Sequence, residues 1–137
     1  MNPKRRGSQY EAAFVTQALK RGLDILEPYG DYMPYDVMVQ NADGRIQRVQ
    51  VKGTGSQIKG KPGYKIVAAS GNTTKVPLSP DAVDVLAAYV ELEDTWYLIP
   101  AKKLNGNISV YLNPNTKQNG RYEVWKEAWN VFQNGGI

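Results

Sequence analysis

Apolar and polar residues alternate on both sides of a short polar segment, Asn41-Ala42-Asp43-Gly44. A hydrophobic period of two is typical of half-buried strands, and Asp-Gly between two such runs is a strong signal for a tight hairpin turn. The pattern therefore predicts a β-hairpin with strands over residues 34–40 and 46–52.

A helical pattern precedes this hairpin. Apolar residues recur at three- and four-residue intervals over residues 8–21, which predicts an amphipathic helix. At about 100° per residue, Glu11 falls in the middle of the apolar arc, where a carboxylate is costly unless it is paired or bound to a metal. A second interpretation stays open, because Ser8-Gln9-Tyr10-Glu11 has the form of a capping box in which Glu11 bonds back to the backbone of Ser8.

The rest of the chain predicts further strands. Short strands are expected over residues 23–27 and 64–68. The apolar run 83–90 fits either a helix or a buried strand, and its proximity to Trp96-Tyr97-Leu98-Ile99-Pro100 favours two paired strands. The succession of elements predicts one α/β domain over residues 1–137, with a mixed β-sheet flanked by helices.

The last predicted element is an amphipathic helix over residues 121–132, ended by Asn134-Gly135-Gly136. Its apolar stripe consists of Trp125, Ala128, Trp129 and Phe132. Aromatic side chains can stack on nucleic-acid bases, but helical spacing favours packing in the core or at a subunit interface.

Three polar side chains converge on the predicted hairpin. Asp36 lies near the start of the first strand, and Gln50 and Lys52 share one face at the end of the second, because side chains alternate along a strand. Taken singly, each is more often structural: Asp is a common turn cap, and Lys at a strand end is commonly solvated. Their order after a helix glutamate, Glu11, is what favours a functional site.

This order resembles the PD-(D/E)XK nuclease superfamily. Pro34-Tyr35-Asp36 corresponds to its "PD" element, Gln50-Val51-Lys52 to its "(D/E)xK" element, and Glu11 to the helix glutamate of the branch that contains archaeal Holliday junction resolvases. Together with residues 96–100, these motifs look like a small bacterial and phage group that includes a group I intron homing endonuclease. The resemblance covers about residues 8–130 and implies a restriction-endonuclease-like core.

The sequence departs from the superfamily pattern at two positions. Tyr35 separates the proline from Asp36, and Gln50 stands in place of an acidic residue. The second departure leaves less negative charge for holding a metal ion.

The resemblance implies a metal-dependent DNA endonuclease with Glu11, Asp36, Gln50 and Lys52 as catalytic residues. Mg²⁺ prefers oxygen ligands and needs only one or two protein carboxylates, and Mn²⁺ is expected to substitute for it. The expected ligands are Asp36, the Gln50 amide oxygen, the Val51 carbonyl and Glu11, the last directly or through water. Lys52 would orient the attacking water or stabilise developing charge. Asp31 is a weaker candidate for a supporting role.

The charge of the chain agrees with a nucleic-acid partner. Lys and Arg number 17 against 13 acidic residues, a net charge of +4, and a cationic surplus favours phosphate-rich partners. The cations expected to contact DNA lie in an N-terminal arm (residues 1–7) and in a Gly-rich loop (residues 53–63) with its flank: Lys4, Arg5, Arg6, Lys59, Lys61 and Lys65. An ordinary solvated loop is an equally open interpretation of residues 53–63.

The chain contains no cysteine and no histidine. Disulfides, thiolate zinc sites, Ser-His-Asp triads and histidine bases are therefore excluded. The glycines of the 53–63 loop are not followed by Gly-Lys-Ser/Thr, which argues against a P-loop NTPase. No long apolar run occurs, so we expect a soluble cytoplasmic protein without a membrane partner. The resemblance implies a bacterial or phage origin.

Several functions remain open at this point. A homing endonuclease and a junction-resolving nuclease both need two cuts, which predicts a symmetric dimer or tetramer acting on double-stranded or branched DNA. The replacement at Gln50 also allows a catalytically weak nucleic-acid-binding module with a nuclease fold. A nuclease acting on RNA is the third alternative.

Overall fold

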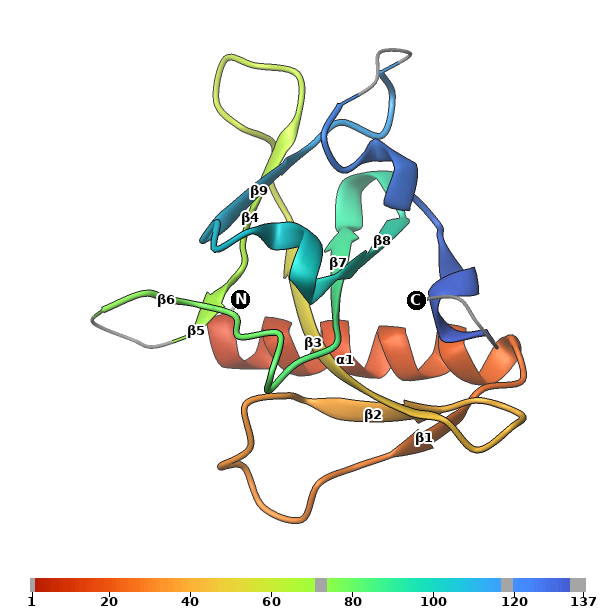
Figure 1. Cartoon of the computed structure of the whole chain (residues 1–137). Helices are drawn as coiled ribbons and strands as arrows, with labels where there is room; N and C mark the ends of the chain where they lie inside the picture. Colours follow the sequence, from red (N-terminus) through yellow and green to blue (C-terminus); the bar gives the residue numbers. More distant parts are fainter. Residues whose placement is uncertain (1, 71–73, 117–119, 134–137) are drawn as a thin grey trace.

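A mixed five-stranded sheet is the centre of the computed structural model, which describes residues 2–70, 74–116 and 120–133 (Figure 1). Its strands lie in the order β1-β2-β3-β7-β8, with β3 and β7 parallel and the other neighbours antiparallel. Their bounds are β1 Asp24–Leu26, β2 Val37–Gln40, β3 Ile46–Thr54, β7 Val85–Val90 and β8 Thr95–Pro100. The predicted α/β class with a mixed sheet is confirmed.

The predicted hairpin is formed by β2 and β3, with Val37 opposite Val49 and Gln40 opposite Ile46. Its turn depends on Gly44, whose φ of +90° lies in the left-handed region that favours glycine. The Asn41 side chain accepts a hydrogen bond from the Arg45 backbone N–H at 3.0 Å and so closes the turn. The first strand begins at residue 37, three residues later than predicted.

The first helix, α1 (Pro3–Lys20), begins five residues earlier than predicted. The Asn2 side chain caps it by accepting from the Lys4 N–H at 2.8 Å, and Pro3 occupies the first helical position, which suits a residue without an N–H. The capping box at Ser8 is therefore wrong, because that residue lies inside the helix. Residues 3–7 of the predicted N-terminal arm belong to this helix. No helix in the described part of the chain is both long enough and apolar enough to cross a lipid bilayer.

One face of the sheet packs on α1. Tyr10, Phe14 and Ala18 of the helix lie in one buried cluster with sheet residues that include Val49 and Val85. Phe14 is the centre of this cluster, since its ring contacts those of Trp96, Trp129 and Phe132.

The opposite face is covered by a two-stranded unit, β4 (Tyr64–Val67) and β9 (Ser109–Leu112), which pair antiparallel. Figure 1 shows this unit at the end of the molecule away from β1 and β2. Because β7 is covered on both sides, its alternate residues are buried in two different clusters, which explains the continuous apolar run over 83–90. Three smaller elements complete this part: β5 Ala69–Ser70, β6 Val76–Pro77 and the 3₁₀ helix η2 Ala101–Leu104.

The predicted C-terminal helix is wrong. Residues 121–132 form two short 3₁₀ helices, η3 (Glu123–Trp125) and η4 (Trp129–Phe132). The chain is interrupted at Glu127, where φ is +51°. The expected burial of aromatic side chains is confirmed for Trp129 and Phe132. The predicted end at 134–136 lies outside the described residues.

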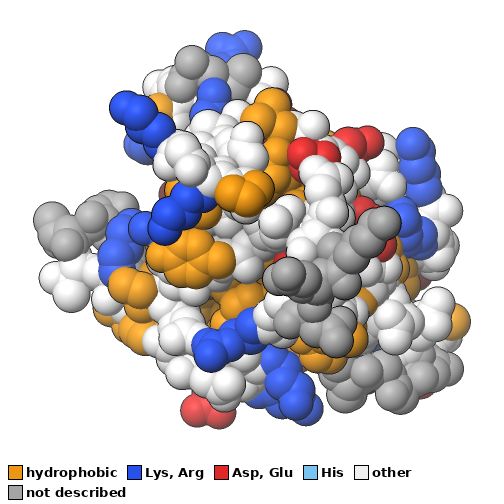
Figure 2. All heavy atoms as spheres, turned by 90° about the horizontal axis from the view of Figure 1, so that it is seen from above, with side chains coloured by type: hydrophobic (Ala, Val, Ile, Leu, Met, Phe, Trp, Pro, Cys, Tyr) orange, Lys and Arg blue, Asp and Glu red, His pale blue; other side chains and the backbone are white. Residues whose placement is uncertain are grey.

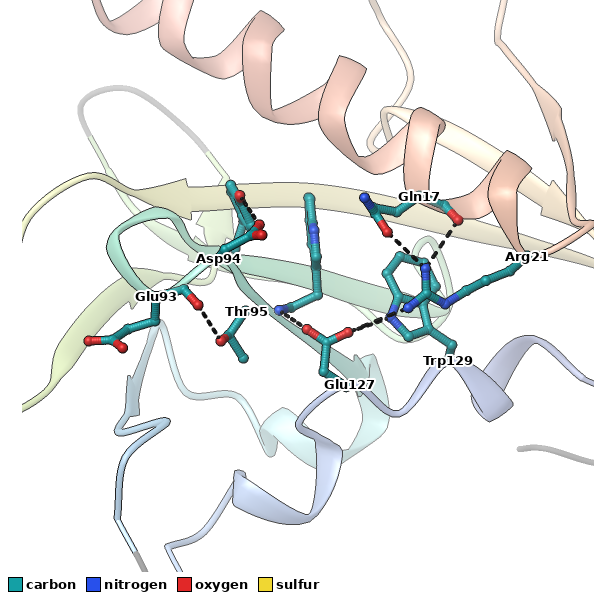
Figure 3. A network of polar contacts seen from close by, with 9 residues as sticks. Gln17, Arg21, Glu93, Asp94, Thr95, Glu127 and Trp129 are labelled. Atoms are coloured by element: carbon teal, nitrogen blue, oxygen red, sulfur yellow. Dashed lines mark hydrogen bonds and ion pairs between the residues drawn. The ribbon is translucent and has the colours of Figure 1, made fainter.

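Tertiary contacts of Glu127 explain this interruption (Figure 3). Its carboxylate accepts hydrogen bonds from the Trp96 backbone N–H at 2.7 Å and from Trp129 Nε1 at 2.8 Å. It also lies 3.7 Å from the guanidinium of Arg21, which stacks over the Trp129 ring at 4.2 Å. These contacts attach the C-terminal segment to β8 and to the end of α1, and a regular helix would break them.

Candidate active site

The hairpin leaves one edge of β3 without a strand partner. β2 pairs with β3 only as far as Val49, whereas β3 continues to Thr54. At this point Asp36 replaces the missing strand: its backbone N–H donates to the Val49 carbonyl at 2.9 Å, and its carboxylate accepts from the Val51 N–H at 2.7 Å. The N–H and C=O of one strand residue project from the same edge, so the Val51 carbonyl also faces this side.

Gln50 and Lys52 extend from the same stretch of β3 into a cleft of about 400 Å³. The cleft is lined by Pro3, Arg6, Gly7, Tyr10, Glu11, Asp36, Gln50, Val51, Lys52 and Gly53. All four residues predicted to be catalytic are therefore brought together. The Gln50 Oε1 atom is buried and has no hydrogen-bond partner. Because an unpaired buried carbonyl oxygen costs free energy, this atom is available for a ligand of the cleft.

Glu11 reaches the cleft from α1 and is half-buried. Burial raises its pKa, and the nearby carboxylates of Asp36 and Glu27 raise it further, while Lys52 acts in the opposite direction. Burial also raises the pKa of Asp36, against the lowering effect of the Val51 N–H and of Lys52. A cation bound beside these two partly buried carboxyl groups would favour their ionised forms and so oppose the effect of burial.

The oxygen atoms of the cleft fit a hard divalent cation. Two carboxylates, one unpaired amide oxygen and one backbone carbonyl are the ligand types that Mg²⁺ and Mn²⁺ accept. In the described ranges, no group of three or more Asp, Glu, His or Cys side chains could hold a metal ion. A cation bound in this cleft would therefore have the Gln50 amide oxygen, and not a third carboxylate, beside Asp36 and Glu11.

The residues predicted to contact DNA are distributed over three places. Arg6 lines the cleft itself, and Lys4 and Arg5 are exposed on the first turn of α1. The predicted Gly-rich loop is shorter than 53–63, because residues 53 and 54 belong to β3. Lys59 and Lys61 are exposed within this loop, and Lys65 is exposed on β4. Asp31 is exposed and is not among the residues that line the cleft.

Sequence reasoning predicted Arg6 and Glu11 as site residues but missed the other cleft-lining residues in the first three turns of α1, which are Pro3, Gly7 and Tyr10. Pro3, Gly7 and Glu11 are spaced four residues apart and share one row on the helix, and Arg6 and Tyr10 form the next row. The signal that could have revealed them is Asn2-Pro3, a helix-start pattern. Burial of Tyr10 and its hydrogen bond to Glu91 raise the pKa of its hydroxyl to about 12, so the hydroxyl is protonated near neutral pH.

Comparison with known proteins extends these observations. A sequence model described as PD-(D/E)XK endonuclease matches residues 1–132. The structure is similar to that of a bacterial homing endonuclease, I-Ssp6803I, with a TM-score of 0.84 and 25% sequence identity over 98% of this chain and 96% of the other. The crystal structure of MepB is a more distant match, with a TM-score of 0.47 and 13% identity over 84% of this chain and 89% of the other. A search of curated protein sequences found no match.

Proposed function

The chain belongs to the PD-(D/E)XK endonuclease family, and on this premise we propose that it is a Mg²⁺-dependent endonuclease that hydrolyses phosphodiester bonds of double-stranded DNA. Nucleases of this family generally use divalent metal ions. The observation that carries the proposal is the meeting of Glu11, Asp36, Gln50 and Lys52 in one cleft, with the Gln50 oxygen buried and unpaired.

Each of these residues has a distinct role in the proposed site. Asp36, Gln50, Glu11 and the Val51 carbonyl would hold the cation, which would neutralise charge on the scissile phosphate and make water a better nucleophile near neutral pH. The Lys52 ammonium would orient that water and stabilise the charge that develops in the transition state. Asp36 also accepts a hydrogen bond from the Val51 N–H, so this proposed metal ligand would also hold the β3 backbone between Gln50 and Lys52 in place.

The surface around the cleft suits a phosphate backbone. Lys4, Arg5 and Arg6 lie at the amino-terminal end of α1, where the helix dipole is already positive and where cations cost helix stability. An anionic partner offsets that cost. Figure 2 shows further Lys and Arg side chains beside exposed hydrophobic ones over the end of the molecule that carries β4 and β9. Lys59 and Lys61 are exposed in the loop after β3 and Lys65 is exposed on β4, and we infer that all three contact the DNA backbone.

The homing-endonuclease type is favoured over the junction-resolving type. The support is the full-length structural similarity to a bacterial homing endonuclease. Such an enzyme cuts both strands at one site, which a symmetric oligomer supplies naturally. The test below also distinguishes three alternatives: a nuclease that acts on branched DNA, a nuclease that acts on RNA, and a DNA-binding module with little catalytic activity.

One cleavage assay tests the proposal. The protein is incubated with linear duplex DNA of high sequence complexity, a four-way junction, single-stranded DNA and RNA, each with Mg²⁺, Mn²⁺ or EDTA. We expect cleavage of duplex DNA at defined positions with either metal and none with EDTA. If the protein cuts only the four-way junction or only RNA, that nucleic acid is its substrate and the proposal of duplex DNA is wrong. Binding to DNA without cleavage under every condition would support the binding-module alternative.

Two substitutions connect any observed cleavage with this cleft. Asp36→Asn keeps an acceptor for the Val51 N–H, and Lys52→Met keeps most of the side-chain volume, so we expect both variants to fold. Each should reduce cleavage at least a hundredfold, in the range of about 10²–10³ for loss of one electrostatic group in an active site. DNA affinity should fall little for Asp36→Asn, since removal of a negative charge reduces repulsion of phosphate. Near wild-type cleavage by Asp36→Asn would refute the assignment.

A further inference from the structure

Tyr10 joins helix α1 to the end of β3, immediately beside the proposed active site. Its ring lies against the backbone of Gly53: a Cβ atom added there would meet the ring carbons Cδ2 and Cε2 at 2.5 and 2.6 Å. Real Cβ contacts are essentially never that short, so the ring can take this position only against a glycine. Tyr10 precedes Glu11 and Gly53 follows Lys52, and the contact therefore connects the immediate neighbours of two proposed site residues.

The hydroxyl of Tyr10 makes a second connection. It donates a hydrogen bond of 2.7 Å to Oε1 of Glu91, the first residue of the 3₁₀ helix η1 (Glu91–Glu93). This turn follows β7, whose last residue, Val90, pairs with Thr54 of β3. The Tyr10 side chain thus fixes α1 to two neighbouring strands at once.

The position of Glu11 depends on this attachment. Asp36, Gln50 and Lys52 belong to the β2–β3 hairpin and its approach, where backbone hydrogen bonds set their positions. Glu11 comes from a separate element that is held against the sheet by side chains. A small sliding movement of α1 would displace the Glu11 carboxylate from the other oxygen atoms of the cleft without breaking any sheet bond.

We propose that Tyr10 is a positioning residue for the metal site: its ring on Gly53 and its bond to Glu91 hold α1 where Glu11 can bind the same cation as Asp36 and Gln50. The inference rests on the proposed function, because it requires that Glu11 is a ligand. It adds a residue that acts through the position of α1 and not as a metal ligand.

The chain supplies a matched control at the other end of the same turn. The hydroxyl of Tyr64 on β4 donates a 2.8 Å hydrogen bond to Oε2 of Glu93. Tyr64 is 3% exposed and Tyr10 is 6% exposed, so the two bonds join similarly buried tyrosines to glutamates two residues apart. Tyr64 lies in the core cluster on the opposite face of the sheet and does not line the active-site cleft.

The test measures Mn²⁺ binding by titration calorimetry without DNA, together with the Mn²⁺ concentration needed for half-maximal cleavage. We expect Tyr10→Phe to weaken Mn²⁺ binding about tenfold, which corresponds to about 1.4 kcal/mol at 25 °C. The concentration needed for half-maximal cleavage should rise in parallel. Tyr64→Phe should bind Mn²⁺ as the wild type does, even if both variants lose similar thermal stability.

Variants at the acceptor test the coupling directly. Glu91→Gln keeps an acceptor oxygen and should bind Mn²⁺ nearly as the wild type does. Glu91→Ala should reproduce the effect of Tyr10→Phe, and the double variant should be no weaker than either single variant, because both remove one interaction. Gly53→Ala forces the Tyr10 ring away and should weaken binding at least as much, with circular dichroism to confirm a folded sample.

The outcomes separate the two proposals. If the wild type binds Mn²⁺ and cleaves DNA but Tyr10→Phe binds Mn²⁺ equally well, only the positioning role is refuted. Equal weakening by Tyr10→Phe and Tyr64→Phe would also refute it, since the effect would then reflect general loss of stability. A wild type that neither binds Mn²⁺ nor cleaves nucleic acid would overturn the proposed function and this inference with it.

Discussion

At the scale of single residues, Gln50 distinguishes this site from one built on three acidic side chains. Its buried, unpaired oxygen lies in a cleft with the carboxylates of Asp36 and Glu11, both of which have raised pKa values. A third carboxylate there would increase the mutual repulsion in the metal-free protein. In the proposed site the amide would supply an oxygen ligand without that repulsion, with a lower metal affinity than a carboxylate would give.

Substitutions at Gln50 therefore have opposite expected effects. Gln50→Glu should lower the melting temperature without metal and increase the stabilisation given by added Mn²⁺, because the new charge repels Asp36 and attracts the cation. Gln50→Ala should raise the Mg²⁺ concentration needed for cleavage. Thermal melts and cleavage titrations with each metal measure both effects. An inactive wild type activated by Gln50→Glu would identify the natural protein as a binding module.

Asp84 provides a prediction about pH. Although burial alone would raise its pKa, two hydrogen bonds from the Arg48 side chain and one from the Arg48 backbone hold the pKa of Asp84 below the usual range. A carboxyl group with a lowered pKa stabilises the fold above the unfolded-state value of about 4, and this contribution is lost as the pH falls through the folded-state pKa.

Asp84→Asn should thus destabilise the protein by about 1 kcal/mol at pH 7, a modest effect because both partners are roughly one-third exposed. The difference from wild type should shrink as the pH falls below about 4. Urea unfolding at pH 7 and pH 3 measures it. Asp24→Asn removes an exposed carboxylate on β1, outside the pair, and should show little effect. A difference for Asp84→Asn that stays constant with pH would contradict the explanation.

At the scale of elements, the hairpin was predictable and the C-terminal segment was not. The Asn41–Gly44 turn and the alternation on both sides carry local information that sets the register of β2 on β3. Residues 121–132 carry an equally clear helical pattern, yet the bonds of Glu127 to Trp96 and Trp129 override it. The contact with Trp96 joins residues distant in sequence, so it cannot be predicted from a local sequence pattern.

The same reasoning applies to the site. Strand periodicity predicted that Gln50 and Lys52 share a face, and the hairpin turn predicted that Asp36 lies near them, whereas the contact of Tyr10 with Gly53 requires knowledge of where α1 lies on the sheet. The start of α1 was misplaced because the apolar periodicity begins only near Tyr10, and Lys4-Arg5-Arg6 were predicted to form a basic arm before the helix. The helix places Arg6 in the cleft and leaves the other two exposed.

The loop after β3 and the strand β4 give a prediction at this scale. Replacing Lys59, Lys61 and Lys65 by Ala should weaken DNA binding for all sequences and reduce the slope of log K against log salt by up to about 3, if each lysine contacts one phosphate. Binding titrations in Ca²⁺ or EDTA over a range of salt concentrations measure this slope.

A matched triple variant removes the same charge elsewhere. Lys20, Lys102 and Lys103 are exposed at the end of α1 and on η2, outside the loop. Their replacement should change the slope much less. If both triple variants change it equally, the effect comes from net charge and not from contacts made by the loop.

At the scale of the whole molecule, cutting two strands of a duplex calls for two active sites. The described cleft lies within one chain, and a two-fold axis would place a second copy on the opposite strand. We therefore expect light scattering to give a mass that is two or four times 15.3 kDa. A monomer both alone and on a duplex target would instead require two successive, independent binding events.

The open edge of β3 also bears on the solubility of the protein. A bare strand edge is a template on which another chain can add its own strand, the usual beginning of aggregation, and natural proteins block such edges with charge. Here the Asp36 carboxylate accepts a hydrogen bond from the Val51 N–H, and the next residue, Lys52, carries a positive charge. We therefore expect the groups proposed to cut DNA to protect this edge of the sheet as well, so that apolar replacement of both should promote self-association through the edge in addition to reducing cleavage.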